Sequence, residues 1–111
     1  FRKANKMAKK RMETANKLLK ENNRKNFYDE TARALWGYLG DKLGISQSEL
    51  TKDKVREILL TKNVNEETTK NLLDTLDICE MALFAPTSGS AGMEKVYQNA
   101  IELIAKIEEQ V

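Results

Sequence analysis

The chain lacks several residue types on which common kinds of functional site depend. It has no histidine, which removes the commonest general base and a principal zinc ligand. Its single cysteine, Cys79, cannot form an internal disulfide, so nothing indicates a secreted scaffold held together by disulfides. No apolar run approaches the ~20 residues that span a bilayer. Metal centres and catalytic triads are therefore weak hypotheses.

Proline is nearly absent too, with one residue in 111, while 41% of the residues are hydrophobic. Alanine, leucine, lysine and glutamate are abundant, and no long segment alternates polar with apolar residues. A chain of this length fits one domain with its own core. These features predict an all-α fold, a compact single-domain bundle of about five helices.

The central helix is predicted at 26–43, with Asn26 as its N-cap and Gly44 as its end. This stretch holds four of the seven aromatic residues, and its apolar arc is wide enough to pack against at least two other helices. Gly37 and Gly40 lie inside it, which predicts that a neighbouring backbone passes close to that side. Its predicted core residues are Phe27, Leu35, Trp36, Tyr38, Leu39 and Leu43.

Four further helices are predicted around it, together with one very short helix near residues 46–50. The first two cover about 2–22 and 52–63. The next begins near residue 66 with a stripe that reaches Leu83, and the last begins at about Ala91 with a stripe that reaches Ile107. Thr51 and Asn65 are in position to cap two of them. The helices are loosely similar to tetratricopeptide helix pairs, although no repeat of fixed period is present. Helical spacing places these additional residues in the core: Leu76, Cys79, Leu83, Tyr97, Ile101 and Ile104.

Charge divides the chain into a basic N-terminal part at 1–25 and an acidic part at 26–111. Both belong to the same predicted domain, and the acidic part contains the rest of the core and a predicted flexible loop at 85–92. The first part has ten basic and two acidic side chains, a net charge of +8, and the second has nine basic and fifteen acidic, a net charge of −6. Such asymmetry indicates an anionic partner or a membrane surface near the N-terminus. The candidate contacts with that anionic surface are Arg2, Lys3, Lys6, Lys9, Lys10 and Arg11.

Three interpretations of this basic helix stay open. Its lysines are the solvated face of an ordinary helix, or they bind nucleic acid, or they lie beside a membrane after a transmembrane helix. Nucleic-acid binding is the weaker reading because no aromatic residues are interleaved with the charges. The chain also begins at Phe1 rather than methionine, which we interpret as a piece of a longer protein.

No constellation of residues predicts catalysis. Asp74, Asp77 and Glu80 share a helix face, but without a histidine or a partner motif they are best read as solvated charges. Cys79 falls on an apolar face, where a free cysteine behaves as a small hydrophobe. There is no glycine-rich phosphate loop. We therefore expect no catalytic residues, no metal site and no cofactor.

Three short motifs carry a resemblance to a known family. They are ALWGYL at 34–39, DKL at 41–43 and CEMALFAP at 79–86. With these motifs the chain, from about Ala4 onward, resembles the helical C-terminal region of the BatD aerotolerance proteins, which follows their last transmembrane helix.

The resemblance implies a membrane-anchored, exported protein that acts with other Bat proteins and a MoxR-type AAA ATPase in aerotolerance and stress survival. It brings no known catalytic residues to this region. We therefore expect a non-enzymatic protein-interaction domain of an inner-membrane protein. The lysines near the N-terminus indicate the cytoplasmic side, while the export of the family leaves the periplasmic side open as the alternative. No small-molecule substrate is expected.

Overall fold

Helices make up nearly all of the computed structural model, which describes residues 2–84 and 90–110 and most of their side chains. No strand occurs within those residues, so the all-α bundle predicted from composition and spacing is confirmed. The elements are α1 (Arg2–Lys20), α2 (Arg24–Leu43), the 3₁₀ helix η1 (Gln47–Glu49), α3 (Lys52–Thr61), α4 (Glu66–Phe84) and α5 (Ser90–Gln110).

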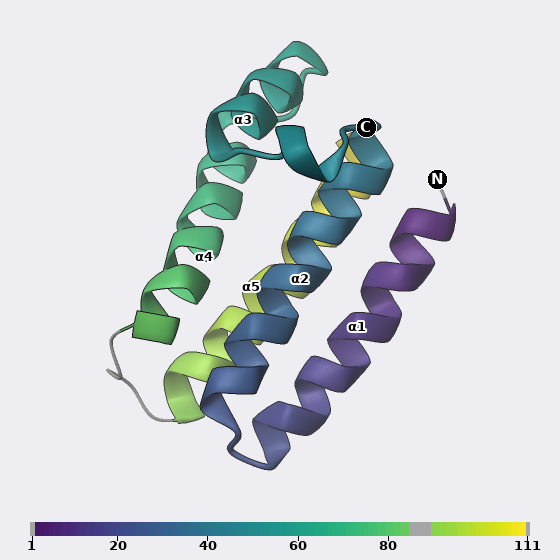
Figure 1. The fold of residues 1–111 in the computed structure, drawn as a ribbon. Coiled ribbons are helices and arrows are strands. Elements are labelled where there is room, and N and C mark those ends of the chain that lie inside the picture. Colours follow the sequence, from purple (N-terminus) through teal and green to yellow (C-terminus); the bar gives the residue numbers. More distant parts are fainter. Residues whose placement is uncertain (1, 85–89, 111) are drawn as a thin grey trace.

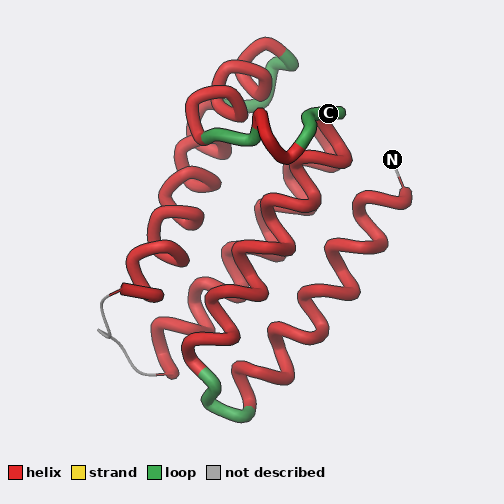
Figure 2. The backbone as a smooth tube through the Cα atoms, in the orientation of Figure 1, coloured by secondary structure: helices red, strands yellow, loops and turns green. Residues whose placement is uncertain are grey.

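The helix α2 lies at the centre of the bundle, which measures 37 × 26 × 25 Å (Figures 1 and 2). It contacts α1, α4 and α5, and α5 in turn contacts α1 and α4. The helices α1 and α4 flank the α2–α5 pair on opposite sides, and α3 packs on α4 (Figure 1). Because α1 runs in the opposite direction to both α2 and α5, its N-terminal half lies beside the C-terminal halves of those two helices.

The turn between α1 and α2 comes earlier in the chain than expected, because α1 ends at Lys20 and α2 begins at Arg24 instead of Asn26. Asn22 adopts a positive φ of 57°, and the N–H of Asn23 donates to the carbonyl of Leu18 at 2.9 Å. Asparagine tolerates this left-handed conformation well, so the chain reverses within three residues. Asn23 occupies the N-cap position, which makes the prediction of Asn26 as the cap wrong.

The other helix ends follow local chemistry. Gly44 ends α2 with a φ of 67°, a conformation that glycine adopts without a steric penalty. The Thr51 hydroxyl accepts a hydrogen bond from the N–H of Lys54 at 3.2 Å, and the Asn65 side chain accepts one from the N–H of Glu67 at 2.7 Å. Most of the loop predicted at 85–92 lies outside the described residues, and α5 already begins at Ser90.

Burial divides the predicted core residues into three groups. Trp36, Leu43 and Tyr97 are partly buried against the core, and the Leu83 side chain is outside the described part. Ile101 was expected in the core but is 39% exposed, because it lies at the edge of the buried α5 stripe, to which Ala100, Leu103, Ile104 and Ile107 belong. The remaining residues are at most 5% exposed: Phe27, Leu35, Tyr38, Leu39, Leu76, Cys79 and Ile104.

The two glycines inside α2 differ in their surroundings. A Cβ at Gly40 would lie 3.2 Å from Cδ1 of Leu50 and 3.3 Å from the carbonyl oxygen of Ile45, so the returning chain does pass close there. A Cβ at Gly37 would meet nothing within 4 Å, so the prediction of a close neighbouring backbone is wrong at that position. Packing within this chain therefore explains only one of the two.

Replacing each glycine by alanine tests this difference. We expect Gly37→Ala to raise the free energy of unfolding by ~0.5–1 kcal/mol, because alanine favours the helix and meets no obstacle. Gly40→Ala should gain less, or lose stability, because Ile45 O belongs to the backbone and yields little. Urea denaturation of both variants measures the difference, and equal stabilisation by the two substitutions would contradict it.

Candidate functional site

A groove follows the seam between α1 and α5. It has a volume of about 520 Å³, within the range of ligand-binding clefts. Apolar side chains form most of its surface, and charged residues from both helices stand beside them. Its lining residues are Lys9, Met12, Glu13, Tyr97, Ile101, Ile104, Ala105 and Glu108.

The groove exists because α1 offers few large apolar side chains to α5. Ala8 and Ala15 bring α1 close to its neighbours, and Met12 is the one bulky residue between them. On the side of α1 toward α5, the next positions are Lys9 and Glu13, which do not cover Ile101. Ile101 therefore remains 39% exposed in the groove wall, above the buried Ile104.

One end of the groove is built on a polar cluster that joins α2 to α5. The Tyr38 hydroxyl donates to Oε2 of Glu108 at 2.5 Å, and Nζ of Lys42 lies 2.8 Å from the same oxygen. The Lys42 side chain is only 3% exposed, whereas that of Glu108 is 22% exposed and lines the groove. The cluster therefore places a carboxylate in the groove and holds it there from behind.

The cluster shifts the pKa values of Tyr38 and Glu108. Burial, reinforced by Glu108, raises the pKa of Tyr38, so the phenol stays protonated and acts as a donor. Partial burial acts to raise the pKa of Glu108, but hydrogen bonds from Lys42 and Tyr38 outweigh it and hold that pKa below its usual range. The arrangement therefore favours a stable carboxylate over a group that exchanges protons near neutral pH.

The predicted basic surface contains exposed lysines and an exposed arginine that is already paired with a carboxylate. Lys6, Lys9 and Lys10 are exposed on α1. Arg11 instead forms an ion pair with Glu30 of α2, with 3.2 Å between Nη1 and Oε1. The side chains of Arg2 and Lys3 lie outside the described part.

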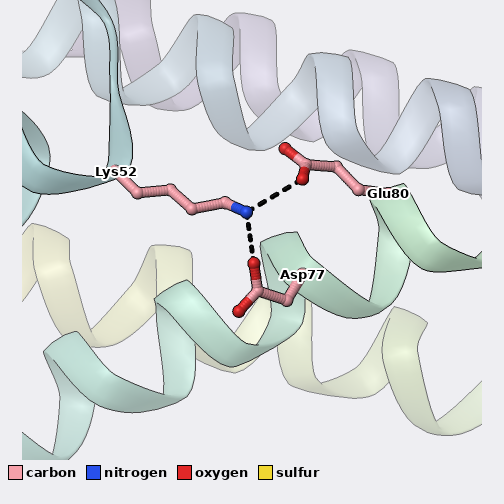
Figure 3. A network of polar contacts seen from close by, with 3 residues as sticks. All are labelled: Lys52, Asp77 and Glu80. Atoms are coloured by element: carbon pink, nitrogen blue, oxygen red, sulfur yellow. Dashed lines mark hydrogen bonds and ion pairs between the residues drawn. The ribbon is translucent and has the colours of Figure 1, made fainter.

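The acidic row on α4 has a partner that its sequence did not reveal. Asp77 and Glu80 both bind Nζ of Lys52, which comes from the first turn of α3, and the Glu80 contact measures 2.8 Å (Figure 3). These hydrogen bonds raise the pKa of Lys52, and the one to Asp77 contributes most. The carboxylates are about half exposed, so the pairs contribute modestly to stability while orienting α3 on α4.

Cys79 is fully buried on the inner face of α4. Burial, with a smaller contribution from the Glu80 charge, raises the pKa of its thiol to about 12. The reactive thiolate is therefore scarce at neutral pH. Among the described residues, no group of three or more cysteine and carboxylate side chains is placed to hold a metal ion.

Comparisons with protein-family models, with curated proteins and with solved structures gave no match for this chain. None of the helices in the described residues is both long enough and apolar enough to cross a membrane.

Sequence reasoning missed both the groove and the polar cluster. Two signals pointed toward the cluster: Tyr38 lies on an apolar helix face, where a buried hydroxyl needs a partner, and Glu108 continues the row Tyr97, Ile101 and Ile104. For the groove, the signal was the small size of Ala8 and Ala15 in the apolar stripe of α1, but it did not indicate which part of α5 would stay uncovered.

The Glu108 carboxylate should make the stability of the protein depend on pH. Because its pKa is lower in the folded than in the unfolded chain, its contribution is present above the ordinary glutamate pKa of about 4.3 and is lost as pH falls through the folded value. Glu108→Gln should flatten the decline in unfolding free energy on acidification. Glu109→Gln removes a charge from an exposed neighbour and should keep the wild-type profile. Identical profiles for all three proteins would contradict the role of the cluster.

Proposed function

We propose that this chain is a non-catalytic, helical protein-interaction domain that binds a partner segment in the groove between α1 and α5. The observation that carries the proposal is the apolar wall around Ile101 and Tyr97, which no described part of the chain covers. Helical domains commonly bind partners by accepting an amphipathic helix in such a groove. A protein segment suits this open seam better than a small molecule, which requires a site that buries most of its surface.

We further propose that the domain is the C-terminal part of a BatD-like inner-membrane protein that acts in aerotolerance. The helical fold supports this, as do the ALWGYL, DKL and CEMALFAP motifs and the basic α1. On this proposal, the domain lies on the cytoplasmic side, and its partners are other Bat proteins and a MoxR-type AAA ATPase.

Partner capture with a matched pair of variants tests the groove. Ile101→Glu places a charge on the groove wall, whereas Ile78→Glu places one on α4, at a position that is 45% exposed and does not line the groove. We expect the wild-type domain and Ile78→Glu to retain the companion ATPase or Bat proteins in pull-downs, and Ile101→Glu to lose them. Thermal unfolding checks that both variants are folded. Equal binding by the two variants would remove the groove from the proposal.

A second candidate function is contact with an anionic membrane surface, which the exposed Lys6, Lys9 and Lys10 favour. At about 1 kcal/mol per lysine, replacing all three by alanine should weaken binding to phosphatidylserine vesicles by roughly a hundredfold. The control replaces the exposed Lys25, Lys54 and Lys62, which changes the net charge equally. Equal losses in the two triple variants would indicate net charge alone, and a gel shift at low salt tests nucleic acid as the anion.

A further inference from the structure

The α1 side of the groove carries a row of basic side chains. Lys9 and Glu13 line the groove, and helical steps of three or four residues continue their face to Lys6, Lys17 and Lys20. All five residues are exposed. We call them the basic rim, in which Glu13 is the single acidic exception.

The α5 side carries the opposite charge. Ile101 and Ala105 line the groove there, and the same helical steps lead to Glu94 and Gln98 in one direction and to Glu109 in the other. Glu108 lines the groove at this end. We call Glu94, Gln98, Glu108 and Glu109 the acidic rim, in which Gln98 is neutral.

The two rims do not neutralise each other. Among the described side chains, no ion pair joins α1 to α5, and Glu108 is paired with Lys42 of α2. Among the described side chains of α1, only Arg11 forms an ion pair, with Glu30 of α2, on the other side of the helix. An apolar groove thus lies between the lysines of the basic rim and the carboxylates of Glu94 and Glu109 on the acidic rim, which form no ion pair among the described side chains.

We propose that the groove binds an amphipathic helix of a partner protein that has an acidic flank and a basic flank on either side of its apolar stripe. This inference rests on the proposed function and names the chemistry of the partner. The apolar stripe packs on Ile101, Tyr97 and Met12, the acidic flank faces the basic rim, and the basic flank faces the acidic rim.

The rims also set the direction in which the helix lies. A partner helix can lie in the groove in two directions with its apolar stripe facing inward. Reversing it end to end moves the flank that faced the basic rim to the acidic rim, and the other flank to the basic rim. Only one direction then places opposite charges together, and the other places like charges together, which is repulsive. A partner with segregated flanks is therefore bound in a single orientation.

Three designed peptides test this on the full 111-residue chain. All are helical, as long as α1, and share one apolar stripe and one composition. The first has an acidic and a basic flank, the second has these flanks exchanged, and the third has both charges mixed on each flank. We expect the first two to bind about tenfold more tightly than the third, since several exposed charge pairs each contribute modestly. A paramagnetic tag at the peptide N-terminus should perturb opposite ends of α5 in the first two complexes.

Charge reversal on the protein supplies the matched control. Lys6→Glu with Lys9→Glu should abolish the advantage of the segregated peptides, whereas Lys25→Glu with Lys54→Glu, which changes net charge equally away from the groove, should preserve it. Two results would overturn the inference while leaving the groove as a binding site. One is equal affinity for the segregated and mixed peptides, and the other is a tag that perturbs the same end of α5 in the first two complexes. The proposed function itself would be overturned if none of the three peptides bound and if Ile101→Glu captured the partner proteins as well as the wild-type domain does.

Discussion

The bundle depends on the burial of α2 on three sides by α1, α4 and α5. Phe27, Tyr28, Leu35, Tyr38 and Leu39 are each at most 2% exposed, and burying a large apolar side chain contributes ~1.5–3 kcal/mol. Tyr38 adds a constraint of another kind, because its buried hydroxyl must find an acceptor. Glu108 of α5 supplies it, so the register of α5 along α2 is set by a polar contact as well as by apolar packing.

The packing of α1 follows a different rule, and the groove is its consequence. Ala8 and Ala15 let α1 approach α2 closely but bury little apolar surface. The next positions toward α5 are Lys9 and Glu13, which remain in solvent. The row on α5 from Tyr97 to Glu108 is therefore covered from the α2 side and left open on the α1 side. The same small and charged residues that make α1 a poor core helix create the apolar wall beside it.

Local patterns predicted most of the fold, because the helix ends at Gly44, Thr51 and Asn65 depend on residues only a few positions apart. Asn22 was missed, since a left-handed asparagine is less common than a glycine at this point of a turn. The contacts of Tyr38 with Glu108 and of Lys52 with Asp77 join residues far apart in sequence, so spacing could not reveal them. Periodicity showed that Ile101 belongs to an apolar stripe but not which edge of that stripe its neighbours leave uncovered.

The described ion pairs between helices reinforce seams that apolar packing already closes. They join α1 to α2, α2 to α5 and α3 to α4, whereas none joins α1 to α5. This seam is therefore the one where a bound helix has most to add, both apolar cover for Ile101 and partners for the charges on the rims. A ligand that binds only the folded state stabilises it by a free energy that grows with the logarithm of the ligand concentration divided by Kd. Occupation of the groove would accordingly hold α1 on the bundle, which couples partner binding to the position of the basic helix.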